Sequence, residues 1–378
     1  MMKNKFLELA APGVQQLQPY LPGKPIDELE RELGINNSIK LASNENPLGP
    51  SLKALEAAKS VIGDVNLYPD GAGFKLSEAL AEKHSTNIDS ITLGNGSNDV
   101  LELIARAFLT NEHSAVFSQY AFAVYPIVTQ AIGAKANVAN AYPADHPTMP
   151  YGHDLDSIYN AIDDLTRIVF IANPNNPTGT WLDINALTDF LNKVPETIIV
   201  VLDEAYYEYM PDELKPDSNG LLKQFDNLIL TRTFSKMYGL AGLRIGYSVS
   251  HPDVADIINR VRQPFNANLI AQEAALSSLS DEQHVANSIA SNTLGLKQLA
   301  NGFTQLGLTN IPSIGNFITV DVKQNAMPIY DALLHEGVIV RPVANYQLPN
   351  HLRITVGTES QNERALGALE KVLKGQYI

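Results

Sequence analysis

The sequence predicts an α/β protein with a large, wound, mostly parallel sheet and a smaller α+β domain. Between residues 88 and 261, short apolar runs rich in Val and Ile alternate with segments of helical period. This alternation is typical of parallel strands covered by helices on both faces. After residue 263 the sequence changes to longer helical stretches separated by few strands. The chain of 378 residues also exceeds the size at which one hydrophobic core keeps growing, which favours two domains.

The strands and helices are expected in the following order. In the first part we expect strands within 90–96, 115–119, 167–174, 197–206, 227–236 and 244–250, and helices within 98–109, 122–133, 184–194 and 253–261. In the second part we expect a long helical stretch at 271–303, strands within 316–322, 337–343 and 352–358, an amphipathic helix between the first two of these strands, and a closing helix at 363–373.

The domain division follows from these patterns and from the start of the chain. The first ~45 residues hold several prolines and little periodicity, which indicates an arm that lies on another surface. We therefore predict an N-terminal arm with the start of the small domain at 1–46, a large domain at 47–262 and a C-terminal small domain at 263–378.

Composition and charge argue against several classes of protein. The net charge is −14 and the Lys and Arg residues are scattered, whereas nucleic-acid binding needs a clustered basic face. With no cysteine there is neither a disulfide framework nor thiolate chemistry, and the eight histidines lack the spacing of metal ligands. No apolar run approaches the roughly 20 residues of a membrane span, and the first residues lack a signal-peptide stretch. We expect a cytoplasmic protein without a protein-bound metal.

Lys236 is the residue that most needs an explanation. It lies in the stretch TFSKMYGLAGLRIGY, among Phe234, Met237 and Tyr238, although lysine is among the residues least often buried. It also follows the strand expected within 227–236, so it emerges at a strand end. A lysine held in apolar surroundings has a lowered pKa and acts as a nucleophilic amine that forms Schiff bases. A lysine that merely extends along the surface to reach water would not explain the nearby glycines.

Two turns are expected at the same edge of the sheet. After the first strand, Gly94 and Gly96 free the backbone N–H groups of a helix that starts near Asn98, which predicts an anion site. An ordinary capped turn would have the same residues. The turn at 173–180 places amide side chains where ligands bind in wound sheets. Such residues also build rigid surface turns, so this alternative stays open.

Asp203 ends the apolar strand expected within 197–206. A carboxylate in this position is poorly solvated and needs a cationic or N–H partner. Tyr206, three residues later, is expected to lie near it. A structural ion pair or a helix cap would place the same residue there. Lys236, Asp203 and the two turns are nevertheless expected to converge on one edge of the sheet.

Pyridoxal phosphate is the cofactor that needs these groups together. Asp203 would pair with its pyridine nitrogen and keep it protonated, so that the ring withdraws electrons from the substrate carbon. Lys236 would bind the aldehyde and, once an amino substrate displaces it, would carry a proton between the substrate and the cofactor. Bonds to the phenolate oxygen are assigned to Asn176 and Tyr206, and the phosphate to Gly96, Ser97, Asn98, Thr233, Ser235 and Arg244.

Four motifs resemble those of the fold-type I pyridoxal-phosphate-dependent aminotransferases of the class II subgroup. They are LASNENPLGPS at 41–51, NPNNPTG at 173–179, DEAY at 203–206 and FSKMYGLAGLRIG at 234–246, in the order of that family. The resemblance extends from about residue 20 to the C-terminus and is greatest to members that act on histidinol phosphate. It implies the fold of that family and the roles given above for the cofactor-binding residues.

The resemblance also assigns residues that the pattern alone does not. Phe122 matches the position whose ring stacks on the cofactor, which is commonly a tyrosine in relatives. Tyr68 aligns with a tyrosine that reaches the cofactor phosphate of the neighbouring subunit, which implies a homodimer. In the substrate pocket the resemblance places Arg353 at a substrate carboxylate, Arg341 at the phosphate of histidinol phosphate, and Asn44 and Tyr20 along the wall. Arg353 would otherwise be a charge at a strand edge.

The implied reaction is the reversible exchange of an amino group between histidinol phosphate and 2-oxoglutarate, which gives imidazole-acetol phosphate and glutamate in histidine biosynthesis. Three alternatives stay open. One is an aminotransferase of the same subgroup for phenylalanine or tyrosine, and another is a decarboxylase of the same fold. The third is a non-catalytic regulator that senses an amine, for which the chain offers no basic DNA-binding segment.

Overall fold

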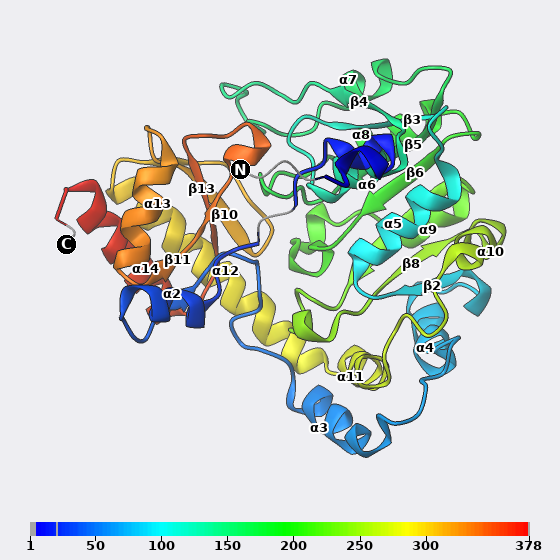
Figure 1. Cartoon of the computed structure of the whole chain (residues 1–378), viewed down its shortest axis with the longest axis horizontal. Helices are drawn as coiled ribbons and strands as arrows, with labels where there is room; N and C mark the ends of the chain where they lie inside the picture. The colour runs from blue at the N-terminus through cyan, green and yellow to red at the C-terminus, as the bar shows by residue number, and fades with distance from the viewer. Residues whose placement is uncertain (1–4, 20–21, 377–378) are drawn as a thin grey trace.

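The computed structural model describes residues 5–19 and 22–376, which form two bodies that lie side by side (Figure 1). The larger body is built on a seven-stranded sheet with the order β2-β8-β7-β6-β5-β3-β4. Its strands are β2 (Ile91–Gly94), β3 (Ser114–Ser118), β4 (Lys135–Ala139), β5 (Thr166–Ala172), β6 (Ile199–Asp203), β7 (Leu228–Thr233) and β8 (Gly246–Ser250). Neighbouring strands are parallel except β8, which runs antiparallel to β2 and β7. The predicted mostly parallel sheet is confirmed.

The edge strand β4 is absent from the prediction made from the sequence. Its residues, KANVA, contain no continuous apolar run, and most of its side chains are exposed. An edge strand has one bonded neighbour and less cover than a central strand, so it lacks the Val- and Ile-rich pattern that marks the others.

Helices cover both faces of the large sheet because successive strand residues point to opposite sides. Phe170 packs with the helices of one face and Ile171 with those of the other. The first face carries α5 (Ser97–Phe108), α6 (Val124–Ile132) and α10 (Pro252–Val261), and the second carries α7 (Leu155–Asn160), α8 (Ile184–Lys193) and α9 (Ser218–Gln224). Side chains that follow the strands at their C-terminal ends therefore alternate between two different surroundings.

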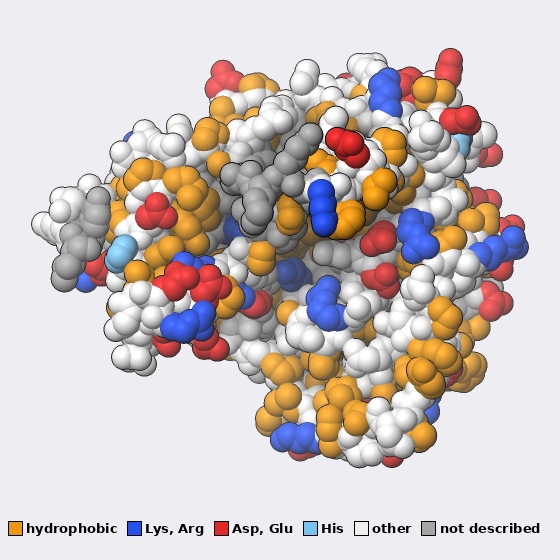
Figure 2. All heavy atoms as spheres, viewed as in Figure 1, with side chains coloured by type: hydrophobic (Ala, Val, Ile, Leu, Met, Phe, Trp, Pro, Cys, Tyr) orange, Lys and Arg blue, Asp and Glu red, His pale blue; other side chains and the backbone are white. Residues whose placement is uncertain are grey.

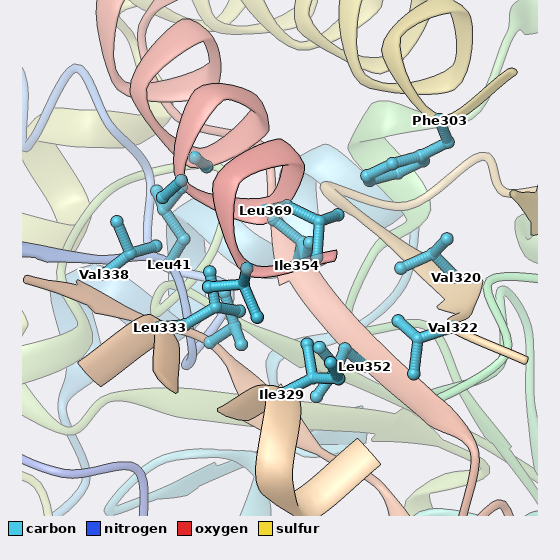
Figure 3. Close-up of a cluster of buried hydrophobic side chains, with 14 of the residues drawn as sticks. Leu41, Phe303, Val320, Val322, Ile329, Leu333, Val338, Leu352, Ile354 and Leu369 are labelled. Carbon is cyan, nitrogen blue, oxygen red and sulfur yellow. The ribbon is translucent and has the colours of Figure 1, made fainter. Parts of the chain in front are cut away.

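The smaller body is an antiparallel sheet packed against three helices. The sheet has the order β12-β13-β10-β9, with β9 (Thr309–Asn310), β10 (Phe317–Asp321), β12 (Arg341–Pro342) and β13 (His351–Thr355). The helices are α12 (Glu282–Gln305), α13 (Ala326–His335) and α14 (Glu359–Leu373). Figure 3 shows the core between these layers, where Phe303, Leu352 and Leu369 are fully buried.

The strand expected within 337–343 is divided between two sheets. Its first part, β11 (Val338–Ile339), pairs in parallel with β1 (Ile39–Lys40), whereas its second part, β12, joins β13. The pairing with β11 attaches β1 to the small body. The chain then continues from β1 to the large body.

The N-terminal segment divides between the two bodies. α1 (Pro12–Gln15) lies on α6 of the large body, where the backbones approach so closely that a side chain at Gly13 would collide. α2 (Ile26–Leu33) belongs to the small body, because Leu29 packs there with Ile339. The predicted arm thus contains a helix that the sequence pattern does not indicate.

Two consecutive helices connect the bodies. The long helical stretch expected at 271–303 is in fact α11 (Leu269–Leu279) followed by α12, whose N-terminus is capped by Asp281. α11 packs against α3 (Leu52–Ser60) and α4 (Phe74–His84), whereas α12 packs against α14 and β10. The predicted domain boundaries stay predictions.

Within residues 5–19 and 22–376, no helix is both long enough and apolar enough to cross a bilayer. The same residues include no group of three or more His, Cys, Asp or Glu side chains arranged to hold a metal ion.

Candidate active site

A pocket of about 340 Å³ lies where the C-terminal ends of β5, β6 and β7 face the small body. Figure 2 shows a hollow between the two bodies on this face, with Lys and Arg side chains around it. The predicted residues that line the pocket are Asn44, Ser97, Asn98, Phe122, Asn176, Asp203, Tyr206, Thr233, Ser235, Lys236, Arg244 and Arg353. The parallel order of the strands thus brings most of the predicted site into one cavity.

The N-terminus of α5 and Arg244 form a cradle for an anion. Gly96 caps α5 with a φ of 87°, and a Cβ there would lie 2.3 Å from Nη2 of Arg244, so only glycine lets the guanidinium approach this backbone. Nη1 of Arg244 donates to Ser235 Oγ at 3.2 Å and to the Ala241 carbonyl oxygen at 3.0 Å. Thr233 Oγ1 accepts from the N–H of Ser235 at 3.1 Å, which fixes the turn after β7. Unpaired helix N–H groups beside a guanidinium fit a phosphate.

Lys236 follows β7 and contributes its amine to the same pocket. Its Nζ donates to the carbonyl oxygen of Ser43 at 2.9 Å. Burial, helped by the positive charge of Arg353, lowers the pKa of Lys236 to about 7. The turn after the lysine requires Gly239, which has a φ of 68° and leaves no room for a Cβ beside the Gly49 carbonyl. An amine with this pKa is largely deprotonated just above neutral pH and is a nucleophile.

Asp203 ends β6 as a buried carboxylate without a cationic partner. Its Oδ2 accepts a hydrogen bond from the Tyr125 hydroxyl at 2.8 Å, and its Oδ1 accepts one from the N–H of Ala205 at 3.3 Å. Within residues 5–19 and 22–376, no Lys or Arg forms an ion pair with it. Burial raises the pKa of Asp203, and the bond from Tyr125 opposes this rise. The carboxylate is therefore suited to a cationic group supplied by a ligand.

Tyr206, Asn176 and Arg353 are joined in one chain of hydrogen bonds. The Tyr206 hydroxyl oxygen accepts from Asn44 Nδ2 at 2.8 Å and from Asn176 Nδ2 at 3.3 Å, which leaves its own proton to donate. Burial raises the pKa of Tyr206 to about 12, so the hydroxyl stays protonated. Arg353 donates through Nη1 to Asn176 Oδ1 and through Nη2 to the Ala42 carbonyl oxygen. These donors fit a phenolate oxygen and a carboxylate.

Arg341 does not line the pocket but lies in the cavity beside it. That cavity shares Pro22 and Tyr346 with the pocket, so the two spaces adjoin. Arg341 also stands opposite Arg353 in the register of β12 and β13. The structure therefore places the two predicted substrate arginines in neighbouring cavities.

Tyr68 lies on the surface of this chain, outside the pocket. Its side chain is 81% exposed and its ring stacks on Phe265 at a centroid distance of 4.6 Å. Tyr20 lies outside the described residues.

Among the residues of the site that the sequence did not predict, Ser43, Tyr346 and Tyr125 make or line its main contacts. The Ser43 carbonyl holds Lys236, but a backbone acceptor leaves no side-chain signal. Tyr346 lines the pocket from a short 3₁₀ turn in the small body, and no motif marks it. Tyr125 bonds Asp203 and follows Phe122 by three residues in the same helical region. Helical spacing at i and i+3 is the one signal that points to a second aromatic residue here.

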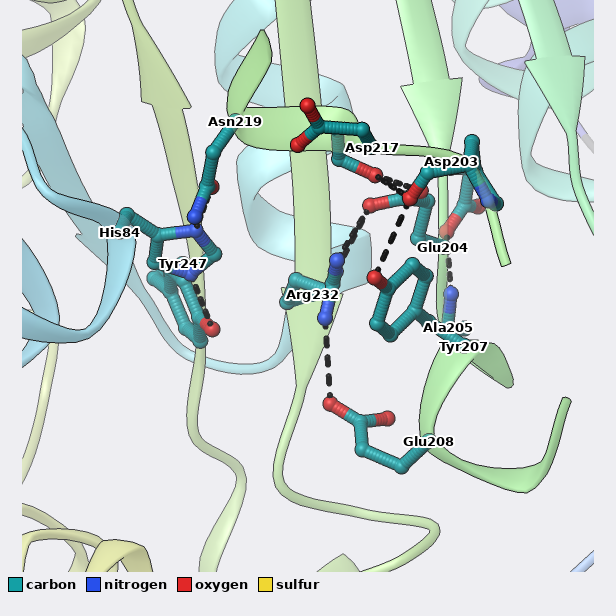
Figure 4. A network of polar contacts seen from close by, with 12 residues as sticks. His84, Asp203, Glu204, Ala205, Tyr207, Glu208, Asp217, Asn219, Arg232 and Tyr247 are labelled. Carbon is teal, nitrogen blue, oxygen red and sulfur yellow. Dashed lines mark hydrogen bonds and ion pairs between the residues drawn. The ribbon is translucent and has the colours of Figure 1, made fainter. Parts of the chain in front are cut away.

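A second polar network lies on the other face of the sheet (Figure 4). Glu204, directly after Asp203, accepts from Arg232 Nε at 2.8 Å and from Ser218 Oγ at 2.6 Å. Arg232 also lies 3.4 Å from Glu208 Oε1, and its guanidinium lies 3.6 Å above the ring of Tyr207. All of these charges are paired inside the protein, and the network does not line the pocket.

Comparison with known proteins agrees with this arrangement. A histidinol-phosphate aminotransferase of Pseudomonas fluorescens is 56% identical over 98% of this chain and 99% of its own length. One of Nitrosococcus oceani is 52% identical over 99% of each chain. The crystal structure of histidinol-phosphate aminotransferase from Sinorhizobium meliloti, in complex with pyridoxal-5'-phosphate, superposes with a TM-score of 0.87 at 29% identity and covers 97% of both chains.

The expected fold-type I architecture, the aminotransferase activity and pyridoxal phosphate as the cofactor are confirmed by these relatives together with the family match. The model of the family described as aminotransferase class I and II matches residues 36–369, and the chain belongs to that family.

Proposed function

We propose that the chain transfers an amino group between L-histidinol phosphate and 2-oxoglutarate, giving imidazole-acetol phosphate and glutamate in histidine biosynthesis. The observation that carries the proposal is the convergence in one pocket of a low-pKa lysine, an anion cradle and a buried carboxylate that has no cationic partner among the described residues. Relatives more than 50% identical over nearly the whole chain bear the name of that enzyme, which supports the choice of substrate. We also place the enzyme in the cytoplasm, as expected from the sequence.

The residues of the pocket fit pyridoxal phosphate, because glycine at position 96 lets the Arg244 guanidinium lie against the N-terminus of α5, where a phosphate would be bound by both. When bound, this cofactor withdraws electrons from the substrate carbon that bears the amino group. We assign its aldehyde to Lys236, its pyridine nitrogen to Asp203, and its phenolate oxygen to Asn176 and Tyr206. The phosphate is assigned to Gly96, Ser97, Asn98, Thr233, Ser235 and Arg244, and the stacking ring to Phe122.

The chain's own groups then bind the substrate and move its proton. Nζ of Lys236, held 2.9 Å from the Ser43 carbonyl oxygen and with a pKa near 7, accepts the proton of the reacting carbon and returns one. Tyr206 keeps its proton and donates it to a ligand oxygen. Arg353 is anchored by two of its N–H groups, so its guanidinium is fixed before a carboxylate arrives.

Histidinol phosphate carries a phosphate where an amino acid carries a carboxylate, so the pocket needs a second anion site. We assign it to Arg341, in the cavity of about 740 Å³ that adjoins the pocket at Pro22 and Tyr346. A phosphorylated side of the substrate would extend past Tyr346 into this space, while 2-oxoglutarate would use Arg353. Asn44 lines the pocket beside Tyr206 and belongs to the wall.

We further propose that the active form is a homodimer in which Tyr68 reaches the partner's site. An apolar surface runs from α3 to α4 (Figure 2), and its most exposed large side chains are Leu52, Ile62, Val65, Leu67 and Tyr68. Apolar patches of this kind mark interaction surfaces. A purified protein that sediments as a monomer while fully active would contradict this.

Steady-state rates test the substrate. We expect kcat/KM with 2-oxoglutarate to be higher for histidinol phosphate than for phenylalanine. An Arg341→Ala variant should reduce kcat/KM for histidinol phosphate about tenfold or more, because a charge-assisted bond is lost, and should leave phenylalanine nearly unaffected. A preference for phenylalanine would establish the aromatic aminotransferase instead, and release of carbon dioxide without keto acid would establish a decarboxylase.

A further inference from the structure

Tyr125 contacts two of the residues assigned to the cofactor, although it does not line the pocket. Its side chain is fully buried, and its hydroxyl donates to Asp203 Oδ2 at 2.8 Å. Its ring meets Phe122 edge-on at a centroid distance of 5.9 Å and an interplanar angle of 86°. One side chain thus joins the carboxylate assigned to the ring nitrogen to the aromatic ring assigned to the ring face.

The surroundings hold Tyr125 in a single orientation. Its ring stacks on Phe170 of β5 at 4.8 Å and 7°, within the cluster that α5 and α6 form over the sheet. The phenol oxygen lies in this core, where an unpaired hydroxyl would be costly. The bond to Asp203 satisfies both groups, so the two side chains fix one another.

A neutral donor is the kind of partner that a ligand-binding carboxylate needs. A hydrogen bond from a hydroxyl stabilises the ionised carboxylate but leaves its full negative charge. An arginine or lysine in the same place would neutralise that charge and compete with a protonated ligand nitrogen. Asp203 has no such competitor among the described residues, and its remaining donors, the N–H of Ala205 at 3.3 Å and the Thr231 side chain, are also neutral.

We propose that Tyr125 is a positioning residue: its hydroxyl keeps the Asp203 carboxylate ionised and aimed at the cofactor's ring nitrogen, and its ring sets the angle of Phe122. This rests on the proposed function, because it requires pyridoxal phosphate in the pocket. Tyr125 contacts neither substrate nor cofactor and acts only through these two residues.

Two titratable groups near Asp203 change charge in the pH range of the test: Lys236, and the buried His153, which bonds the carbonyl oxygen of Ala172 next to Asp203 in the sheet. Burial raises the pKa of Tyr125 and of Tyr206, so both stay neutral. Lys236 shares the pocket and has a pKa of about 7, so it adds its own pH dependence to cofactor binding. An Asp203→Asn background retains the contributions of Lys236, of His153 and of the cofactor's own phosphate, so the difference between this variant and the wild type reports on Asp203.

The decisive variant is Tyr125→Phe, which removes one oxygen and keeps the ring. Pyridoxal phosphate is titrated into the apo-protein at a series of pH values, and binding is followed by visible absorbance. We expect affinity to fall roughly tenfold or more near neutral pH, as for the loss of a bond to a charged group. The loss of affinity at acid pH should also begin at a higher pH than in the wild type, because Asp203 takes up a proton more easily.

A matched control is Tyr209→Phe. Tyr209 is also buried, and its hydroxyl lies near Asn316 and not near Asp203. We call the part of the binding curve where affinity is lost as the pH falls its acid limb. The same chemical change at Tyr209 should leave the acid limb at the same pH as in the wild type. A merely structural role of Tyr125 would lower stability without moving that limb.

Two further proteins keep the test decisive if Tyr125→Phe folds poorly. In Tyr125→Phe/Asp203→Asn, cofactor affinity should equal that of Asp203→Asn alone, because the hydroxyl acts through the carboxylate. Difluorotyrosine at position 125 keeps the packing and strengthens the donor, so the acid limb should move to lower pH. Additive losses in the double variant, or an acid limb that neither change moves, would overturn the role of Tyr125. Failure of the wild type to bind pyridoxal phosphate would refute the proposed function itself.

Discussion

Asp203 and Glu204 are consecutive buried carboxylates at the end of the same strand, yet they have opposite surroundings. Asp203 faces α6 and the pocket, where its partners are the hydroxyls of Tyr125 and Thr231 and a backbone N–H, all of them neutral. Glu204 faces α9, where Arg232 and Ser218 satisfy it completely. Both carboxylates are at most 4% exposed. Burial therefore does not distinguish a ligand-binding acid from a structural one, whereas the absence of a cationic partner does.

The difference follows from the two-residue period of the strands. In β6 and β7, Asp203 is in register with Thr231, so Glu204 lies beside Arg232 on the opposite face. An ion pair inside a protein must recover the cost of removing both charges from water, and here Tyr207 and Glu208 add further contacts to the guanidinium (Figure 4). The charges of the network face are paired with one another, whereas the pocket face is left with charges for a ligand.

The largest effect is expected from the pocket face. Lys236→Ala should abolish turnover and remove the visible absorbance of bound pyridoxal phosphate, because no other lysine of residues 5–19 and 22–376 lines the pocket. The exposed residue Lys297 provides the control, since Lys297→Ala should change neither. Spectra and steady-state rates of the two variants decide the matter. Turnover retained without Lys236 would contradict its role as the reacting amine.

Next in size is a change on the network face. Glu204→Gln leaves Arg232 buried with a weakened partner, so the free energy of unfolding should fall by about 3–5 kcal/mol. Urea denaturation of the apo-protein measures this. Replacement of the exposed pair Arg260–Asp256, whose side chains are 72% and 60% accessible, should change stability by less than about 1 kcal/mol. The correctly folded Glu204→Gln protein should retain its kcat, and a large loss of kcat would show that the network acts on the pocket.

Asp203→Asn should have the opposite effects to Glu204→Gln, with little loss of stability and a large loss of kcat. Asp203→Asn removes a buried carboxylate that has no counter-charge, so the apo-protein should lose little stability. Pyridoxal phosphate would lose its partner at the ring nitrogen, and kcat should fall about a hundredfold, as expected when a bond between charged groups is lost. Denaturation curves and rates measured on Asp203→Asn and Glu204→Gln in parallel separate the two faces. Equal effects of both changes on both quantities would remove the distinction.

The sequence could predict the pocket face better than the network face. Lys236, Asp203 and Asn176 each follow a parallel strand, and such strands end at one edge whatever the register between them. The pairing of Glu204 with Arg232 depends on register, which a single strand pattern does not reveal. A structural ion pair is the alternative considered for Asp203 from the sequence, and it occurs one residue later.

Other parts of the molecule had signals too weak or too distant to use. The edge strand β4 is too polar to match a buried-strand pattern. Tyr125 has an ordinary helical position, and only the tertiary packing of α6 on the large sheet brings its hydroxyl to Asp203. Arg341 and Arg353 were placed by resemblance, and their separation into adjoining cavities requires the antiparallel pairing of β12 with β13.

His84 offers the smallest and most selective test of the network face. Its Nδ1 lies 2.9 Å from Asn219 Oδ1 and its Nε2 lies 3.0 Å from the Tyr247 hydroxyl, and burial, with the charge of Arg232, lowers its pKa to about 4. An unfolded histidine has a pKa near 6.5, so the unfolded state binds more protons between these values and stability falls as the pH falls. At pH 5 the loss amounts to about 2 kcal/mol relative to pH 8.

The measurement is the pH dependence of the unfolding free energy of the wild type and of His84→Gln. The buried His153 also has a pKa of about 4 and contributes to the acid sensitivity of both proteins, so only the difference between them reports on His84. We expect the dependence between pH 8 and 5 to be weaker in His84→Gln by about 2 kcal/mol over that range. Identical curves would mean that the pKa of His84 is the same in the folded and unfolded states. The network face would then be more open to water than its packing indicates. Cofactor affinity should be unchanged in His84→Gln, because the two carboxylates at the end of β6 belong to separate surroundings.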